Sequence, residues 1–159
     1  KVRELGRKIS ADYAGKELIV IGVLKGSLYF FSDLTRAIDI PIAVDVIAIG
    51  TIPNTTRQTG IVKITKDLDL NITGKHVLVV EDIIRTGLTT AYLVQYLDAR
   101  KPASIYVCSL LTNSDQQLIN VPIAYHGFEI TKTRLIGYGM DINEQGRNYP
   151  DIYELRDEQ

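Results

Sequence analysis

The sequence predicts an α/β fold, in which a mostly parallel twisted sheet is flanked by helices. Apolar runs of strand length alternate with helical segments from residue 18 to residue 111, and this alternation is typical of a parallel sheet. The runs 18–24 and 77–80 are continuously apolar, as expected for strands buried on both faces. The 159 residues, 45% of them apolar and 23% charged, suit a single soluble domain spanning residues 1–159.

The N-terminal segment has the spacing of an amphipathic helix. Val2, Leu5, Ile9 and Tyr13 recur three or four residues apart, and Gly15 stands where a helix C-cap is expected. The chain begins within this helical pattern and without Met, so we expect that native N-terminal residues are missing.

The rest of the chain predicts the sheet, its helices and a small lobe. Strands are expected over residues 18–24, 42–49, 61–66, 76–80 and 104–111, and helices over residues 27–38 and 88–100. Ser27 is the expected N-cap of the first of these helices. Residues 50–60, polar with a glycine at each end, predict a mobile loop. Short strands over residues 123–127 and 135–139 predict a C-terminal lobe of about residues 120–159.

Charge and cysteine content exclude several classes of function. The net charge of -1 gives no electrostatic basis for binding nucleic acid or an acidic membrane, and no apolar run approaches the roughly 18–20 residues of a membrane span. Cys108 is the single cysteine and lies in an apolar run, which predicts a buried thiol and a cytoplasmic protein. His76 and His126 are fifty residues apart, so a histidine or thiolate metal site is not expected.

The candidate site follows the apolar residues 77–80. Glu81 and Asp82 stand where a parallel strand is expected to end, and ligands bind beyond such ends in open α/β sheets. Thr86 and Thr89 offer hydroxyl groups, Gly87 permits close backbone approach, and the next helix offers free N–H groups. The segment is therefore expected to bind phosphate, and its carboxylates suit sugar hydroxyls or Mg²⁺.

The order of these residues is more specific than their composition. This order closely resembles the motif that binds 5-phosphoribosyl-1-pyrophosphate (PRPP) in type I phosphoribosyltransferases. It consists of four apolar residues, Glu-Asp, two Ile, one variable residue and Thr-Gly-x-Thr. Other segments of the chain resemble the hypoxanthine-guanine phosphoribosyltransferases. Residues 21–27 resemble the pyrophosphate loop of that family, residues 63–74 the stretch before its PRPP loop, and residues 127–130, 137–141 and 147–148 its purine-binding lobe. The resemblance covers residues 18–150 and implies the type I phosphoribosyltransferase fold with a C-terminal hood lobe.

The same resemblance implies an activity. It implies a purine salvage enzyme that transfers the 5-phosphoribosyl group of PRPP to hypoxanthine or guanine, releases pyrophosphate and uses Mg²⁺. It also implies a homodimer or homotetramer whose partners are PRPP and a purine base, with no nucleic-acid or membrane partner.

Roles for individual residues follow from the resemblance. Lys25 and Gly26 are implied to present backbone N–H groups to pyrophosphate, and Arg147 to pair with it, since a planar guanidinium suits phosphate oxygens. Glu81 and Asp82 are implied to hold the ribose hydroxyls and, with Asp141, a metal ion. The other implied phosphate ligands are Ile84, Arg85, Thr86, Gly87, Leu88 and Thr89, and the implied purine ligands are Asn113, Arg134, Leu135 and Asp141.

Four positions depart from the family's pattern. Arg85 replaces the Asp that exchanges a proton with the purine, and a guanidinium cannot accept a proton. Asn113 replaces a Lys that recognises the purine 6-oxygen, and Arg134 replaces a stacking aromatic ring. Thr51-Ile52 replaces a Ser-Tyr pair that closes over the reacting centre. The implied phosphoribosyl and pyrophosphate ligands are thus kept, whereas those for the purine and for closure have changed.

Three hypotheses remain open on the sequence alone. The first is the purine transferase with slow turnover. The second is a PRPP-dependent transferase with another acceptor, since Arg85 and Arg134 would favour an anionic or carboxylate-bearing heterocycle. The third is a non-enzymatic regulator that binds PRPP or a nucleotide. A generic nucleotide-binding fold is disfavoured because the chain has no Walker or dinucleotide loop, and the changed residues also fit drift or engineering without a new role.

Overall fold

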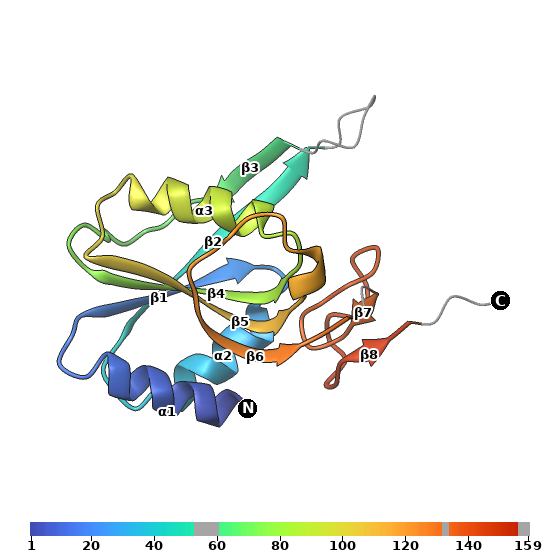
Figure 1. Ribbon diagram of the computed structural model, residues 1–159, viewed down its shortest axis with the longest axis horizontal. Coiled ribbons are helices and arrows are strands. Elements are labelled where there is room, and N and C mark those ends of the chain that lie inside the picture. Colours follow the sequence, from blue (N-terminus) through green and yellow to red (C-terminus); the bar gives the residue numbers. More distant parts are fainter. Residues whose placement is uncertain (53–60, 132–133, 156–159) are drawn as a thin grey trace.

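A six-stranded sheet forms the centre of the protein. The computed structural model describes residues 1–52, 61–131 and 134–155. The strand order is β3-β2-β1-β4-β5-β6 (Figure 1). The parallel strands are β2 (Ala43–Ile52), β1 (Leu18–Leu24), β4 (His76–Ile84), β5 (Ser104–Thr112) and β6 (Ile123–Glu129). At one edge β3 (Ile61–Lys66) pairs antiparallel with β2. The predicted mostly parallel α/β fold is confirmed.

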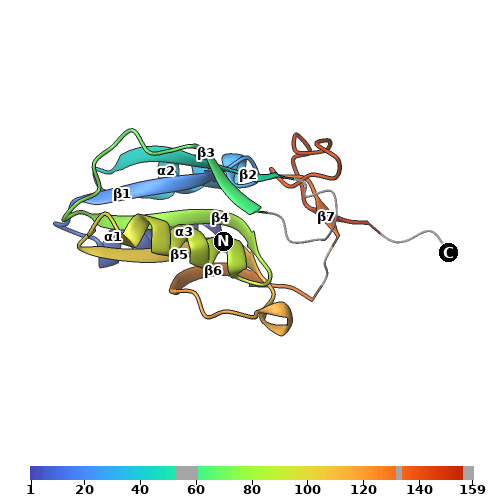
Figure 2. The same ribbon diagram turned by 90° about the horizontal axis from the view of Figure 1, so that it is seen from above.

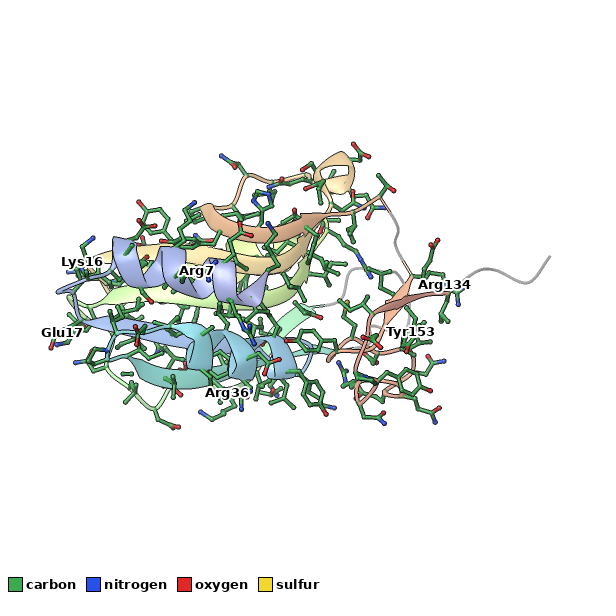
Figure 3. The ribbon with its side chains drawn as sticks, turned by 90° about the horizontal axis from the view of Figure 1, so that it is seen from below. Arg7, Lys16, Glu17, Arg36, Arg134 and Tyr153 are labelled. Carbon is green, nitrogen blue, oxygen red and sulfur yellow. The ribbon has the colours of Figure 1, made fainter. Side chains whose placement is uncertain are left out.

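Helices cover both faces of this sheet. Helices α1 (Val2–Asp12) and α2 (Leu28–Ala37) lie side by side on one face, and α3 (Leu88–Asp98) lies on the other (Figures 1 and 3). None of the helices in the described part of the chain is long and apolar enough to cross a membrane.

Two apolar cores explain the continuous apolar runs. Val20 and Leu78 face the core shared with α1 and α2, whereas Ile21 and Val79 face the core shared with α3, and all four side chains are fully buried. Successive side chains of a strand point to opposite faces, so a strand covered on both faces needs an apolar residue at every position. Each such side chain contributes about 1.5–3 kcal/mol on burial.

A small lobe lies beyond the carboxyl ends of the parallel strands. Strands β7 (Leu135–Ile136) and β8 (Tyr153–Glu154) form a separate antiparallel pair there (Figures 1 and 2). Because β6 pairs with β5 in the large sheet, the lobe starts after β6 and not at about residue 120. The strand expected over residues 135–139 ends at Ile136, since the next three residues have φ angles of 101°, 50° and 103°, which no extended strand adopts.

Several element boundaries also differ from those expected. β2 continues through Gly50 to Ile52 because these residues pair with β3, so the first residues of the expected loop 50–60 are strand. Residues 53–60, and the side chains of Thr51 and Ile52, lie outside the described residues. β4 continues to Ile84, and α3 ends two residues earlier than expected. Ser27 is the N-cap of α2 as predicted, but its hydroxyl donates to the carbonyl oxygen of Val23 at 2.6 Å instead of capping the helix.

Candidate active site

The segment between β4 and α3 forms a small cavity at the end of the sheet. Its volume is about 230 Å³, and it is lined by Glu81, Ile83, Ile84, Arg85, Thr86, Gly87, Thr89 and Thr90. The structure therefore brings together the residues predicted for phosphate and ribose, with two exceptions. Asp82 and Leu88 do not line this cavity, and the side chain of Leu88 is about half exposed.

Gly87 is required where the loop turns into α3. It is the N-cap of this helix, and its φ of 79° favours glycine. A Cβ atom there would lie 2.8 Å from the carbonyl oxygen of Ile119, which is too close for a carbon atom. The carbonyl oxygen of Thr86 also accepts hydrogen bonds from Leu118 N at 3.0 Å and Ile119 N at 3.3 Å. The segment after β5 therefore contacts the β4–α3 loop and helps to hold its backbone in place.

Glu81 and Asp82 form an acid pair at the end of β4, in which Glu81 is buried and Asp82 is partly exposed. Burial raises the pKa of Glu81 well above its usual value, the neighbouring Asp82 raises it further, and the Thr90 hydroxyl at 3.4 Å offsets part of the effect. Burial also raises the pKa of Asp82, while backbone N–H groups and the charges of Arg147 and Arg85 act in the opposite direction. A bound cation or a set of hydroxyl donors would stabilise both carboxylates.

The loop between β1 and α2 lies against this acid pair. A Cβ atom on Gly26 would overlap Asp82 Oδ2, and a Cβ atom on Gly139 would overlap the carbonyl oxygen of Gly26. The Leu24–Lys25 peptide bond in this loop is cis. The β1–α2 loop, the carboxyl end of β4 and the C-terminal lobe therefore meet at one point.

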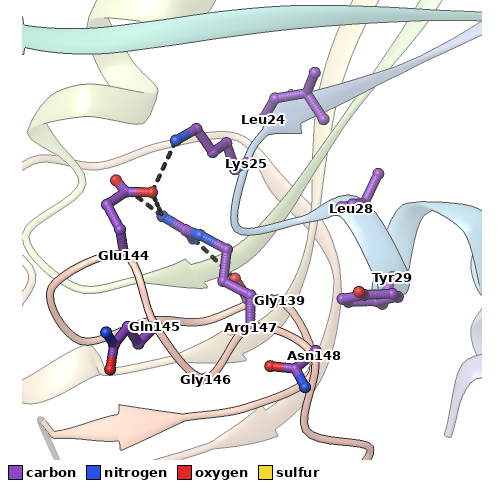
Figure 4. Close-up of a pocket in the computed structure, with 10 residues that line it drawn as sticks. All are labelled: Leu24, Lys25, Leu28, Tyr29, Gly139, Glu144, Gln145, Gly146, Arg147 and Asn148. Carbon is purple, nitrogen blue, oxygen red and sulfur yellow. Dashed lines mark hydrogen bonds and ion pairs between the residues drawn. The ribbon is translucent and has the colours of Figure 1, made fainter.

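A second cavity, of about 530 Å³, opens beside this meeting point (Figure 4). It is lined by Leu24, Lys25, Leu28, Tyr29, Gly139, Glu144, Gln145, Gly146, Arg147 and Asn148. Of the predicted pyrophosphate ligands, Lys25 and Arg147 face it from opposite sides, and Glu144 lies between them (Figure 4).

Arg147 is fixed by the lobe that carries it. Its Nη2 lies 2.8 Å from Asp141 Oδ1 and 3.4 Å from Glu144 Oε2, and its Nη1 donates to the carbonyl oxygen of Gly139 at 2.8 Å. Its Nε is buried and has no hydrogen-bond partner among the described residues. The structure thus joins two predicted site residues, Asp141 and Arg147, in one ion pair.

The predicted purine ligands, all of them among the described residues, line neither of these two cavities. Asn113 is buried at the end of β5, and its Oδ1 accepts from Gln116 N at 3.3 Å as the N-cap of a short 3₁₀ helix, η1 (Ser114–Gln116). Leu135 packs in the α1–α2 core. Arg134 lies exposed at the start of β7 (Figure 3) and lines neither of the two cavities.

Three residues with contacts at the site were missed from the sequence. Glu144 pairs with both Lys25 and Arg147, and the three-residue spacing of Asp141, Glu144 and Arg147 is a signal that pointed to it. Tyr138 was seen only as part of a motif, yet its hydroxyl donates to Asp33 Oδ2 at 2.6 Å and ties the lobe to α2. No local sequence signal marked Asp33.

Comparison with known proteins agrees with this geometry. Residues 1–143 match the family model described as the phosphoribosyl transferase domain. The chain is 41% identical to the hypoxanthine-guanine phosphoribosyltransferase of Mycobacterium tuberculosis, over 98% of this chain and 80% of the relative. It is 39% identical to that of Dictyostelium discoideum, over 99% and 90%. A crystal structure of a hypoxanthine-guanine phosphoribosyltransferase from Bacillus anthracis superposes with a TM-score of 0.91 at 41% identity, covering 98% of this chain and 91% of that one.

Fold, site and relatives lead to the same conclusion. The protein is a phosphoribosyltransferase, and phosphoribosyltransferases are a class of glycosyltransferase. The sheet and the β4–α3 loop are the features that place it in this class. Within that class, the chain belongs to the hypoxanthine-guanine phosphoribosyltransferase family, as the sequence motifs predicted.

Proposed function

We propose that the protein transfers the 5-phosphoribosyl group of PRPP to hypoxanthine or guanine and releases pyrophosphate. The observation that carries this proposal is the contact of three segments at one point, where Gly26 lies between Asp82 and Gly139. The cavity of the β4–α3 loop, which Glu81 lines, and the cavity of Lys25 and Arg147, which Gly139 lines, both adjoin these segments. A ligand with a phosphate at one end and a pyrophosphate at the other suits this arrangement.

The acid pair would hold the ribose of PRPP. Carboxylates accept hydrogen bonds from vicinal hydroxyl groups, and such bonds would replace the water that Glu81 and Asp82 lose on burial. The two residues would in this way fix the sugar between the two cavities. Correct orientation of the anomeric carbon is itself a large part of catalysis in a displacement reaction.

The charged ends of PRPP would bind to different segments. The hydroxyls of Thr86 and Thr89 and the N–H groups at the start of α3 suit the 5-phosphate. Lys25, the backbone at Gly26 and Arg147 suit the pyrophosphate, which gains negative charge as its bond to the ribose breaks. Positive groups at this end stabilise the leaving group.

The carboxylates also fit a divalent cation that binds together with its substrate. In the described part of the chain no three carboxylate, imidazole or thiolate groups gather to hold a metal by themselves. This fits Mg²⁺, which usually takes one or two carboxylates together with phosphate oxygens and water. Glu81 and Asp82 are the proposed carboxylate ligands, and the ion would neutralise pyrophosphate charge. The third predicted ligand, Asp141, does not gather with them in the described part of the chain. Both oxygens of Asp141 already have partners, Arg147 and Glu144 N, so its part would require exchange of one of them.

The acceptor end is where this chain differs. Arg85 lines the phosphate cavity and cannot accept the purine proton, so turnover would rely on orientation and charge stabilisation. The loss of a general base lowers rates by about 10²–10⁴-fold. Asn113 offers its amide nitrogen as a donor to a base, and Leu135 and Arg134 remain proposed purine contacts.

We also propose that the protein is a cytoplasmic homodimer or homotetramer. Light scattering would measure its oligomeric state.

The test is an assay of nucleotide formation. PRPP and Mg²⁺ are incubated with hypoxanthine, guanine and a carboxylate-bearing base, and nucleoside monophosphate and pyrophosphate are measured together. The proposal expects slow formation of the hypoxanthine or guanine nucleotide, and loss of this activity in Asp82→Asn. Turnover of the carboxylate-bearing base alone would instead support another acceptor, and PRPP binding without turnover of any base would support a regulator.

A further inference from the structure

One carboxylate joins two cations that come from distant parts of the chain. Lys25 Nζ, in the β1–α2 loop, lies 2.8 Å from Glu144 Oε2, although the two residues are 119 positions apart. Arg147 Nη2 approaches the same oxygen at 3.4 Å (Figure 4).

The turn that carries Glu144 holds it in a defined place. Asn143 and Glu144 have φ angles of 52° and 64°, a left-handed conformation that is uncommon for residues other than glycine. Reciprocal backbone hydrogen bonds of 3.1 Å between Ile142 and Gln145 close this turn, and Asp141 Oδ2 accepts from Glu144 N at 2.8 Å. Such conformations persist only where the surroundings enforce them. The turn is therefore built to present Glu144 to the cavity.

Lys25 and Arg147 are donors suited to an anion with several oxygens. Carboxylate and phosphate oxygens use the same charge-assisted hydrogen bonds. Arg147 also has a buried Nε without a partner in the described part of the chain, so its bonding capacity is not used up by the protein. A second anion at this place would compete directly with Glu144.

We propose that Glu144 is a positioning residue whose carboxylate takes the place of a pyrophosphate oxygen between Lys25 and Arg147 in the ligand-free protein, and that it sets the affinity for pyrophosphate. This inference rests on the proposed function, because it assigns the second cavity to the pyrophosphate end of the substrate. Binding of the ligand then requires Glu144 to release both cations, and departure of the product lets it pair with them again.

The expected size of the effect follows from the exposure of the pair. The side chains of Lys25 and Glu144 are both 66% exposed, and exposed ion pairs contribute little. Removal of the competing charge should therefore tighten pyrophosphate binding by about two- to tenfold and not by orders of magnitude. A role of Glu144 in simply holding the lobe together would give the opposite sign, because Arg147 would then lose its support.

The experiment is a calorimetric titration of inorganic pyrophosphate, with and without Mg²⁺, into the wild type and four variants. Glu144→Gln should bind about two- to tenfold more tightly than the wild type. Glu17→Gln removes the same charge from the Glu17–Lys75 pair, which lies away from both cavities, and should bind like the wild type. The gain from Glu144→Gln should be smaller in a Lys25→Met background, which needs the single and the double variant. Thermal melting of each variant checks that it is folded.

Three results would overturn the inference, and they separate it from the proposed function. Equal or weaker binding by Glu144→Gln, while the wild type binds pyrophosphate, overturns the role of Glu144 and leaves the proposed function in place. No pyrophosphate binding by the wild type or by any variant overturns both. A gain that is undiminished in the Lys25→Met background contradicts the competition for Lys25.

Discussion

Gly26 and Asp82 are in direct contact, since a Cβ atom on Gly26 would overlap Asp82 Oδ2. The two residues belong to different crossovers of the sheet, and both stand at the carboxyl ends of neighbouring parallel strands, β1 and β4. This contact joins the proposed pyrophosphate loop to the proposed ribose site. A side chain at residue 26 would have to move either the loop or the carboxylate.

Gly26→Ala should therefore reduce activity far more than stability. Overpacking at a close contact costs about 1–3 kcal/mol, and displacement of a site carboxylate by about 1 Å lowers turnover by about 10²-fold. Thermal melting and nucleotide formation measure the two effects. Gly15→Ala is the control, because Gly15 lies away from the site with open space around it. Its positive φ, which Gly26 does not share, should cost the variant stability while activity is kept. Unchanged activity in Gly26→Ala would contradict the assignment of this loop.

Arg85→Asp should raise the rate of nucleotide formation by about 10²–10⁴-fold, the usual contribution of a general acid or base. The reason is that a carboxylate at the phosphate loop can exchange a proton with the purine, which a guanidinium cannot do. Pyrophosphate release with hypoxanthine and with guanine measures the change. Arg85→Ala removes the cation without adding a base and should show no such gain. A lower rate in Arg85→Asp than in Arg85→Ala would refute the argument.

The ligand-free protein should lose stability as the pH rises above the usual glutamate pKa of 4.5. Burial raises the pKa of Glu81 in the folded state, so the folded protein binds the proton more tightly than the unfolded chain does. The stabilisation from this proton is complete below pH 4.5 and is lost as the pH rises through the higher, folded pKa. The Glu81→Gln variant has no titrating group at this position, so it should not lose this stability as the pH rises.

Melting temperatures of the wild type and of Glu81→Gln should thus converge at acid pH and separate toward neutral pH, with the variant more stable. Each 1 kcal/mol corresponds to about 2–4 °C in a protein of this size. Glu81→Asp keeps a titrating carboxylate and should follow the wild type in the direction of its pH dependence. A constant difference between Glu81→Gln and the wild type at every pH would show that the burial of Glu81 is not the cause.

Tyr138→Phe should loosen the C-terminal lobe from α2. The hydroxyl of Tyr138 donates to Asp33 Oδ2, and burial, together with this bond, raises the pKa of Tyr138. Loss of one hydrogen bond to a partly exposed charge should lower the free energy of unfolding by about 1–2 kcal/mol and raise the KM for PRPP, since Arg147 lies in the same lobe. Denaturant melts and steady-state kinetics measure both. The matched control is Tyr106→Phe, an exposed tyrosine of β5. Equal losses in both variants would argue against the contact.

The sequence predicted the parallel sheet because the signals for it are local. An apolar residue at every position of the runs 18–24 and 77–80 is explained by two cores, one on each face. The phosphate loop was predicted for the same reason, since Glu81 to Thr89 are contiguous and their order is specific. Strand ends were less predictable: β4 continues through the acid pair to Ile84 because β5 pairs with it along that length.

The parts of the site that the sequence did not reveal depend on contacts between distant segments. Glu144 meets Lys25 across 119 positions, and no periodic pattern encodes such a meeting. Asn113 was expected to face a base, whereas the structure uses its side-chain oxygen to cap η1, a role that a single polar residue after a strand does not reveal. The positive φ of Tyr138, which helps to end β7, is also set by the lobe around it, because tyrosine has no preference for that conformation.

The most direct test of the account is calorimetric titration of PRPP with Mg²⁺ into the wild type and into a Thr86→Val/Thr89→Val double variant. These substitutions keep the shape of the loop and remove two proposed phosphate donors. We predict one PRPP bound per chain of the wild type, and binding at least about tenfold weaker in the double variant, since each hydrogen bond to a charged group contributes about 1.5–3 kcal/mol. No PRPP binding by the wild type, or equal binding by both proteins, would contradict a PRPP site at the β4–α3 loop.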